Sequence, residues 1–342
     1  MNISLFTADL NAVFMLSVGA FLLSMALTPV YTYFAYRHRF WKRQRSTSTL
    51  GEKLEIFTKL HAKKFNRSIP TMAGIVGIVA ITVVTYCFNW SRAETWLPLA
   101  ALLGGAVVGL IDDIINIRGS GLGVAGMRSS LKFVMVVAMS LMLGWFFFVK
   151  LGYTSVHIPF LGDWQLGMWI VPLFVLAVVS TGNAVNISDG LDGLAGGLLA
   201  ISYATFGIIG LLQGHLMIAG FCFTVVGALL SYLWFNIYPA RFFMGDTGAI
   251  ALGTTLGVVA MLTDSVMALF LIAFIYSLES GSVALQLISK KFFHRKIFLA
   301  APLHHHFEAR GWPEPKVVMR AWIFTALTAL IGVMVGILGM GL

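Results

Sequence analysis

The sequence predicts an all-α polytopic membrane protein with about ten transmembrane helices. Of its 342 residues, 58% are hydrophobic and only 11% are charged, and the mean hydropathy is +0.88. Soluble domains carry about 25% charged residues, so this chain has too little polar surface to fold as a water-soluble globule. The composition excludes a soluble enzyme, a disordered chain and a secreted disulfide scaffold. We expect residues 1–342 to form a single integral-membrane domain.

Ten apolar runs meet the length of ~20 residues that a helix needs to cross the hydrocarbon core. The expected spans, in chain order, lie at roughly 12–36, 71–90, 96–114, 129–149, 166–185, 194–213, 216–237, 247–263, 265–289 and 318–341. An even number of spans places both termini on the same side of the membrane.

The basic residues predict which side that is. All but two of the 23 Lys and Arg residues fall on one face of this arrangement, and the exceptions are Arg92 and Lys150. Lys and Arg concentrate in cytoplasmic loops, so this face is predicted to be cytoplasmic and both termini external, on the periplasmic side. The net charge of +9 then reflects topology, and no nucleic-acid partner is needed to explain it.

Two adjacent acids, Asp112 and Asp113, close the apolar run GAVVGLIDDI at the predicted cytoplasmic end of the third span. Adjacent carboxylates at a span end are costly to desolvate and repel each other. A divalent cation or a shared proton would relieve that cost. The alternative is a helix end whose acids reach out to water.

The segment NAVNISDGLDGLAGG places four polar side chains at a short turn between the fifth and sixth spans: Asn183, Asn186, Asp189 and Asp192. Asn183 and Asn186 follow helical spacing, so their side chains are expected to converge. The adjacent glycines allow a ligand to approach closely. The alternative is a capped helix–turn–helix, because Asn and Asp are good cap residues.

Further polar groups are predicted at the same face. Asp246 lies between two glycines at the start of the eighth span, where it is expected to cap the helix, and Asn236, Phe242 and Phe243 suggest a polar site beside aromatic rings. The loop APLHHHFEARGWPEPK contains three histidines in a row. Consecutive histidines cannot all face one point on a helix, so a three-His zinc site is not expected. Imidazoles suit phosphate oxygens and proton transfer, and a solvated polar loop is the alternative.

Two other patterns have simpler interpretations. The basic segment HAKKFNRSIP precedes the second span, and attraction to anionic lipid is sufficient to explain it. GLGVAG at 121–126 matches G-x-G-x-x-G but follows no strand, so we expect a loop and no dinucleotide site. Taken together, acids, basic groups, histidines and aromatics at one membrane face are what a nucleotide-diphosphate substrate with Mg²⁺ requires.

At this point a resemblance is clear. GLIDDI, NAVNISDGLDGLAGG, FFMGDTGAIALG and APLHHHFEARGWPEPKVVMRAW resemble the phospho-N-acetylmuramoyl-pentapeptide transferases, the MraY family of the polyprenyl-phosphate N-acetylhexosamine-1-phosphate transferase superfamily. The likeness spans nearly the whole chain. It implies Mg²⁺-dependent transfer of phospho-MurNAc-pentapeptide from UDP-MurNAc-pentapeptide to undecaprenyl phosphate, which yields lipid I and UMP. It also implies a homodimer in the bacterial inner membrane that serves peptidoglycan synthesis, cell wall biogenesis, cell shape and cell division.

The resemblance also implies roles for individual residues. The catalytic set is Asp112, Asp113, Asp246 and His305, and Asp246 is the Mg²⁺ ligand, with Asp112 and Asp113 as further candidate ligands. The substrate-binding set is Lys64, Thr71, Lys132, Asn183, Asn186, Asp189, Asp192, Asn236, Phe243, Gln286, His304 and His306.

The ninth span, with ESGSVALQ from Glu279 to Gln286, fits the family pattern and is expected to line a lipid groove and to kink at its Gly-Ser pair. Three positions depart from the pattern. Asn116 replaces the usual Lys, two extra residues separate Lys64 from Pro70, and Ala73 replaces a usual Gly.

Two other functions remain as alternatives. A sister transferase that uses UDP-GlcNAc shares the Asp-Asp and NxxDGxDG motifs, whereas the three-His loop with GWPEP favours the pentapeptide substrate. A secondary transporter belongs to a different class of protein. Transporters place ionisable groups near the bilayer midplane, where this sequence offers only Glu279.

Overall fold

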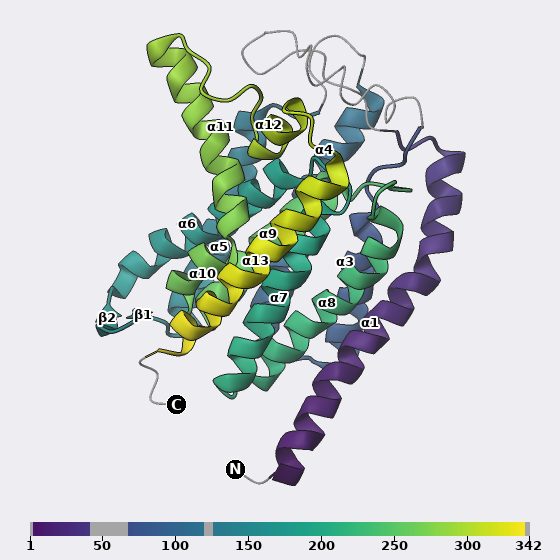
Figure 1. Cartoon of the computed structure of the whole chain (residues 1–342). Helices are drawn as coiled ribbons and strands as arrows, with labels where there is room; N and C mark the ends of the chain where they lie inside the picture. The colour runs from purple at the N-terminus through teal and green to yellow at the C-terminus, as the bar shows by residue number, and fades with distance from the viewer. Residues whose placement is uncertain (1–2, 42–67, 120–125, 339–342) are drawn as a thin grey trace.

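The computed structural model describes residues 3–41, 68–119 and 126–338, and within these ranges the protein is almost entirely helical (Figure 1). Eight of the described helices are long and apolar enough to cross a membrane. They are α1 (Ile3–Arg37), α4 (Trp96–Arg118), α5 (Ser129–Val149), α6 (Ile170–Ser188), α7 (Leu194–Leu212), α8 (Leu216–Asn236), α9 (Gly245–Leu262) and α13 (Glu314–Ile337). The prediction of an all-α polytopic membrane protein is thus confirmed.

The two remaining predicted spans differ from simple crossing helices. α3 (Gly74–Phe88) has 15 residues, so it is about 22 Å long and shorter than the ~30 Å hydrocarbon core. The predicted span at 265–289 is two helices, α10 (Val266–Ile272) and α11 (Phe274–Phe293), which meet at an angle of 78°. Counted as one span, this pair raises the number of described membrane-length segments to nine.

The expected kink at the Gly-Ser pair is wrong. α11 continues as a helix through Gly281 and Ser282, and the break lies at Ala273, with φ −99° and ψ 25°. Glycine and serine permit a kink but do not impose one, because their helical backbone can remain intact. Ala273 is buried, so the break lies inside the protein.

Two small elements lie outside the long helices. A hairpin of β1 (Ser155–Ile158) and β2 (Gly162–Gln165), followed by the short 3-10 helix η1 (Gly167–Trp169), joins α5 to α6. α12 (Leu303–Ala309) lies between α11 and α13. α1 begins and α13 ends at one end of the bundle, whereas α1 and α4 end at the opposite end, which also carries α12 (Figure 1).

The centre of the bundle is α9, and every one of its residues is buried. α9 packs most extensively against α4 and α6. The approach of α4 is close because Gly109 has no side chain: a Cβ there would lie 2.2 Å from the carbonyl oxygen of Asp246. This contact sets the C-terminal end of α4 directly against the first turn of α9.

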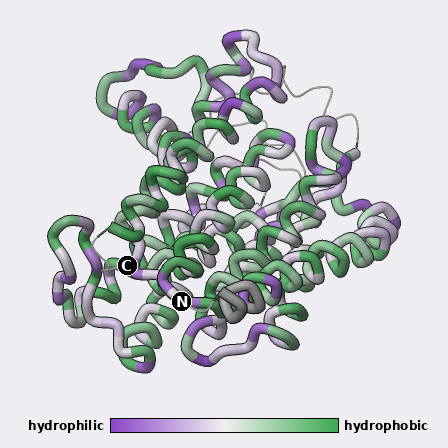
Figure 2. Tube along the Cα trace, turned by 60° about the horizontal axis from the view of Figure 1, so that its bottom comes forward, coloured by the Kyte–Doolittle hydropathy of each residue, from purple (hydrophilic) through white to green (hydrophobic). Residues whose placement is uncertain are grey.

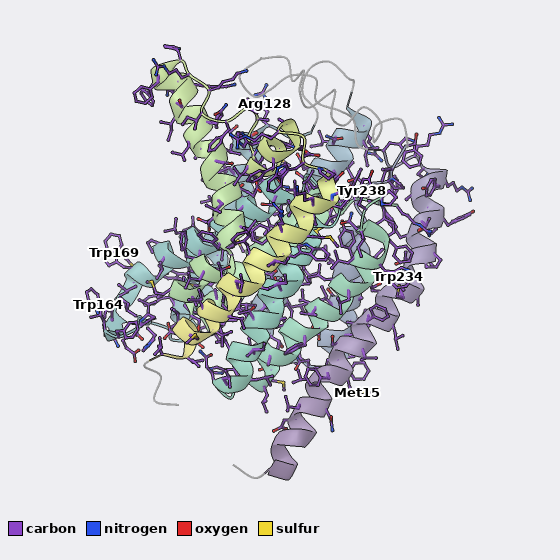
Figure 3. All side chains as sticks on the ribbon, viewed as in Figure 1. Met15, Arg128, Trp164, Trp169, Trp234 and Tyr238 are labelled. Carbon is purple, nitrogen blue, oxygen red and sulfur yellow. The ribbon has the colours of Figure 1, made fainter. Side chains whose placement is uncertain are left out.

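Most helices of the bundle consist largely of hydrophobic residues, as the green in Figure 2 shows, and many large hydrophobic side chains are exposed. Met15 and Trp234 lie on its flank with 69% and 71% of their surface exposed (Figure 3). Trp164 and Trp169 lie at one end, and Arg128 and Tyr238 lie toward the other (Figure 3). Aromatic residues gather at both interfaces of membrane proteins, so this distribution is typical of a chain that spans a bilayer.

Candidate active site

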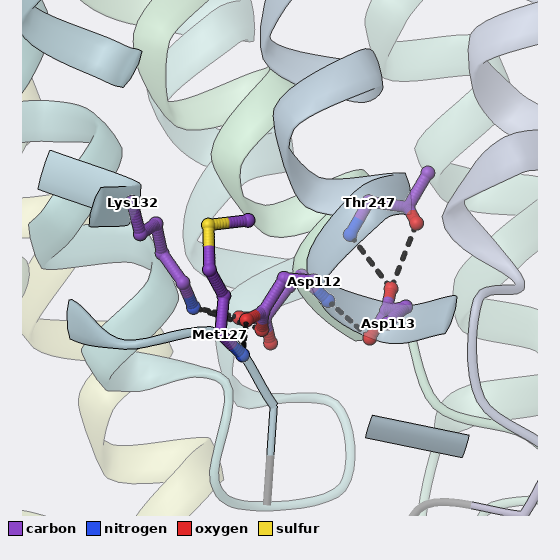
Figure 4. Close-up of polar contacts among 6 residues, drawn as sticks. Asp112, Asp113, Met127, Lys132 and Thr247 are labelled. Carbon is purple, nitrogen blue, oxygen red and sulfur yellow. Dashed lines mark hydrogen bonds and ion pairs between the residues drawn. The ribbon is translucent and has the colours of Figure 1, made fainter. Parts of the chain in front are cut away.

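The two adjacent acids at the end of α4 point to different partners (Figure 4). Asp112 accepts a hydrogen bond from the backbone N–H of Met127 at 2.6 Å and one from the Lys132 ammonium at 2.9 Å. Lys132 lies in the first turn of α5 and also contacts the carboxylate of Asp246 in α9. One ammonium therefore joins two carboxylates that lie far apart in the sequence.

Asp113 binds the start of α9. Its carboxylate accepts hydrogen bonds from the backbone N–H groups of Asp246, at 3.2 Å, and Thr247, at 2.9 Å, and from the Thr247 hydroxyl at 2.7 Å. The first backbone N–H groups of a helix have no partner within the helix, so Asp113 supplies one from α4. The expectation that Asp246 caps its own helix is wrong, because Asp246 lies inside the first turn and the cap comes from Asp113.

Three carboxylates and one ammonium lie close together at this position. The side chains of Asp112, Asp246 and Lys132 are 5%, 10% and 15% exposed, and Asp113 is buried beside them. Among the described residues, one ammonium accompanies these three carboxylates. Buried carboxylates are unfavourable without compensating charge, so the Lys132 ammonium stabilises the charged forms of Asp112 and Asp246.

The segment before α3 lies against the segment before α9. The backbone N–H of Phe243 donates to the carbonyl of Pro70, and the N–H of Ala73 donates to the carbonyl of Phe243. Thr71 is buried, and a Cβ on Gly245 would lie 2.9 Å from its hydroxyl oxygen. Thr71 and Phe243, which are distant in sequence, are therefore brought beside the Asp113–Asp246 contact, as the predicted site requires.

The turn between α6 and α7 is held from two sides. The backbone N–H of Asp192 donates to Glu314 at 2.6 Å, and its carboxylate accepts the N–H of Ala240 at 3.0 Å. Asn236 accepts the N–H of Gly193 at 2.9 Å and donates to the carbonyl of Phe242 at 2.9 Å. Asn236 thus links the turn to the chain that leads into α9.

The two predicted asparagines of α6 lie one turn before this loop. The side-chain amide of Asn183 donates to the carbonyl of Val179 in its own helix, at 3.0 Å. Asn186 and Asp189 are partly exposed. The exposed surface of this part of the site therefore includes polar side chains of α6 and the turn.

The three consecutive histidines have three separate partners. Nδ1 of His304 lies 2.9 Å from Glu279 in α11, and Nδ1 of His305 lies 2.7 Å from Glu308 in α12. Nδ1 of His306 accepts the backbone N–H of Leu299 at 3.1 Å, and burial, with Arg310 nearby, lowers the pKa of His306. The three Nδ1 atoms therefore face three different partners.

Gln286 holds the chain that returns from α11. Its side-chain oxygen accepts the N–H groups of Ile297 and Phe298, both at 3.0 Å, and its amide donates to the carbonyl of Phe298 at 3.1 Å. Gln286 therefore fixes the connection between α11 and α12. The predicted site residue Lys64 lies outside the described residues.

Comparison with known proteins identifies the family. A model described as glycosyl transferase family 4 matches residues 95–264. A phospho-N-acetylmuramoyl-pentapeptide-transferase from Chloroflexus aurantiacus is 34% identical over 339 residues, which cover 95% of this chain and 89% of the relative. The chain belongs to the phospho-N-acetylmuramoyl-pentapeptide transferase family. Other members similar to it come from Levilactobacillus brevis, 36% identical over 93% of this chain and 96% of theirs, and Clostridium kluyveri, 38% identical over 80% and 86%.

The family expected from the motifs is thus confirmed, and the structure adds residues of the phospho-N-acetylmuramoyl-pentapeptide transferase fold that the motifs did not indicate. Thr247 and Met127 bind the paired acids. Glu308 binds His305, and Glu314 binds the turn before α7. Glu308 follows His305 by three residues, a spacing at which side chains on a helix contact each other. This contact could therefore have been predicted from the sequence. The others lie too far from their partners in sequence.

Proposed function

We propose that this chain transfers phospho-MurNAc-pentapeptide from UDP-MurNAc-pentapeptide to undecaprenyl phosphate and releases UMP. The proposal rests on sequence identity of 34% and 36%, over 95% and 93% of this chain, to relatives named phospho-N-acetylmuramoyl-pentapeptide-transferase. An oxygen of the lipid phosphate forms a bond to the β-phosphorus of the nucleotide sugar. The bond from that phosphorus to UMP breaks, and the product is lipid I.

The charged cluster suits this reaction. Asp112 orients the attacking lipid phosphate or accepts a proton from it, and Lys132 binds phosphate oxygens in addition to its two carboxylates. Asp113 acts by holding Asp246 and Thr247 in place. His305 and the polar groups of the α6–α7 turn are proposed to bind the nucleotide sugar. Phosphoryl transfer depends mainly on positioning and charge stabilisation, which such an arrangement supplies.

The residues present fit Mg²⁺. Among the described residues, no three acidic or histidine side chains form a metal site by themselves. Mg²⁺ is commonly held by one or two carboxylates together with substrate phosphates and water, and Asp112 and Asp246 converge on one cationic group. We propose Asp246 as the principal ligand, with Asp112 and Asp113 nearby. Mg²⁺ bound there would offset charge on the diphosphate and on the departing UMP.

An apolar cavity of about 260 Å³ supports the proposal that the acceptor is a lipid. It lies among α6, α9, α10 and α11, and its lining includes Leu173, Leu256, Phe270 and Tyr276. The break at Ala273 belongs to this lining, so the bend between α10 and α11 shapes the cavity. An isoprenoid chain is a ligand of matching chemistry.

We further propose the setting in which the reaction occurs. The end of the bundle that carries Asp112 and Asp246 would face the cytoplasm, because Arg37, Arg118 and Lys290 lie on helix ends of that side. Both termini would be external, with ten crossings if α3 is one of them. The protein would act in the bacterial inner membrane as a single transferase unit that forms homodimers.

The deciding experiment compares UDP-MurNAc-pentapeptide with UDP-GlcNAc, using purified protein, undecaprenyl phosphate and Mg²⁺, and measures UMP and lipid product. We expect product only with the pentapeptide substrate. Product with UDP-GlcNAc would indicate the sister transferase, and uptake of substrate into vesicles without UMP release would indicate a transporter. The Asp246→Asn variant should fold but not turn over, and normal activity in it would refute the assigned site.

A further inference from the structure

A buried contact joins α11 to α12. One carboxylate oxygen of Glu279, Oε2, accepts the backbone N–H of His304 at 3.2 Å and lies 2.9 Å from Nδ1 of the same residue. Glu279 is 4% exposed and His304 is 1% exposed. A carboxylate can only accept these bonds, so Nδ1 carries a proton and the plane of the imidazole is fixed.

The opposite edge of the imidazole faces the α6–α7 turn. A Cβ on Gly190 would lie 2.5 Å from Nε2 of His304, so the ring packs directly beneath this glycine. Nε2 is buried and has no hydrogen-bond partner among the described residues. Gly190 itself is exposed, which means that His304 supports the turn from its buried side while the other side remains open.

The turn is the one that the proposed function assigns to the nucleotide sugar, since Gly190 lies between Asp189 and Asp192. Its far end is already tied by Glu314 and Asn236. Glu279 and His304 therefore complete its support at the end nearest α6. Contacts of this kind, made by residues behind the ligand-binding groups, keep those groups in the geometry that binding requires.

We propose that Glu279 is a positioning residue, which holds His304 against Gly190 and thereby sets the α6–α7 turn for nucleotide-sugar binding. This inference rests on the proposed function, because it takes the nucleotide sugar as the ligand of the turn. Glu279 acts through His304 and does not touch the substrate. Its contribution belongs to the nucleotide sugar and not to the lipid acceptor.

The test measures Kd for UDP-MurNAc-pentapeptide by calorimetry on the purified full-length protein, and KM for undecaprenyl phosphate by UMP release. Glu279→Ala and His304→Ala are each expected to weaken nucleotide-sugar binding about tenfold or more, the range seen when an outer-layer partner is lost. The KM for the lipid should stay unchanged. Glu279→Gln should bind almost as wild type, because a single amide oxygen can accept both bonds that Oε2 accepts now.

Gly190→Ala perturbs the contact from the other side, because the three atoms nearest to its added methyl group all belong to the His304 ring. It should weaken binding in the wild type but have little effect in His304→Ala, where the ring is gone. Likewise, Glu279→Ala should add no loss to His304→Ala. A general loss of folding would instead make the losses add, and thermal unfolding of each variant monitors this.

Two controls match these substitutions. Gly281→Ala adds a methyl group in α11 where no atom lies within 4 Å. Asp264→Ala removes a carboxylate that likewise accepts a backbone N–H, from His157 at 2.9 Å, in the loop between α9 and α10. Both should bind the nucleotide sugar as wild type does.

The inference is overturned if Glu279→Ala binds the nucleotide sugar normally, if its loss adds fully to that of His304→Ala, or if Glu279→Gln is as defective as Glu279→Ala. It is equally overturned if the loss appears in the KM for the lipid alone. Failure of the proposed function looks different, because the wild-type protein would then neither bind UDP-MurNAc-pentapeptide nor release UMP from it.

Discussion

The Asp113 carboxylate at the end of α4 accepts two hydrogen bonds from Thr247, one from its backbone N–H at 2.9 Å and one from its hydroxyl at 2.7 Å. Both residues are buried. These hydrogen bonds therefore connect α4, which carries Asp112, to α9, which carries Asp246, next to the candidate site. Under the proposed function, the geometry of the reacting groups depends on this contact.

Thr247→Val should lower stability by ~1 kcal/mol, because it removes one hydrogen bond from a buried carboxylate. Thermal unfolding in detergent measures the loss. Thr224→Val is the matched control, since the Thr224 hydroxyl is buried but donates only to the Gly220 carbonyl of its own helix. Equal losses in the two variants would show that the bond to Asp113 has no special value.

Gly109→Ala should disrupt the site more than any neighbouring glycine substitution in α4. The new methyl group would lie 2.2 Å from the carbonyl oxygen of Asp246, and backbone atoms cannot move aside without separating the helices. Gly104→Ala meets only the side chain of Met139, which is flexible. Turnover should be lost in Gly109→Ala and largely kept in Gly104→Ala, and comparable activities would refute the close-approach argument.

Lys132→Met should reduce both turnover and stability. It leaves Asp112 and Asp246 buried without their shared cation, which costs about 3 kcal/mol or more. Adding Asp112→Asn removes one of these charges, so the double variant Asp112→Asn/Lys132→Met should regain stability but not activity. Unfolding temperature and UMP release distinguish the two effects. A double variant less stable than Lys132→Met would contradict the charge argument.

Ser277→Phe should raise the KM for undecaprenyl phosphate about tenfold and leave the KM for the nucleotide sugar unchanged. Ser277 lines the apolar cavity beside the helix break, and a phenyl ring there would fill space needed by the lipid chain. Leu285→Phe, in the same helix at an exposed position outside that lining, is the control. If the KM for the nucleotide sugar changes instead, the assignment of the lipid chain to this cavity is refuted.

The hairpin between α5 and α6 should stabilise the protein in a pH-dependent manner. Nδ1 of His157 lies 2.7 Å from Asp163 and Nε2 lies 2.9 Å from the carbonyl oxygen of Leu338. The hydrogen bond to Asp163 is the main cause that raises the pKa of His157 above its usual value, and burial opposes it. Both ring nitrogens face acceptors, so the protonated imidazole is the stabilised form.

Because the folded-state pKa is raised, the stabilisation is fully present below the ordinary histidine pKa of about 6.5 and is lost as pH rises through the folded-state value. The difference in unfolding temperature between wild type and His157→Gln should therefore be largest near pH ~5.5 and shrink toward pH ~9. His215→Gln, at a 40% exposed side chain, controls for loss of a histidine. A difference that grows with pH would contradict this sign.

The long apolar runs made most of the fold predictable, because each helix must present ~20 apolar residues to the membrane. The break between α10 and α11 was not predictable. It falls at Ala273, where neither Pro nor Gly interrupts the sequence. The β1–β2 hairpin was also missed, since strands of four residues are too short to show clear alternation.

The sequence predicted candidate site residues, several of which the structure brings together, but it did not predict their contacts. Asp112, Asp113 and Asp246 stand out as acids at the ends of apolar runs. That Lys132 would join Asp112 to Asp246 could not be inferred, because these residues are brought together only by packing of α4, α5 and α9. The same holds for Glu279 and His304, which are separated by a helix and its return connection.

The complete enclosure of α9 has a consequence for the membrane in which the protein works. Bilayers of different thickness impose hydrophobic mismatch on helices that contact acyl chains, which respond by tilting. No residue of α9 is exposed to acyl chains, since all of them are buried, whereas few residues of α1 are buried. Mismatch would thus be absorbed by the peripheral helices. The depth of Asp246 is set by protein packing, so under the proposed function we expect the reaction to tolerate changes in acyl-chain length.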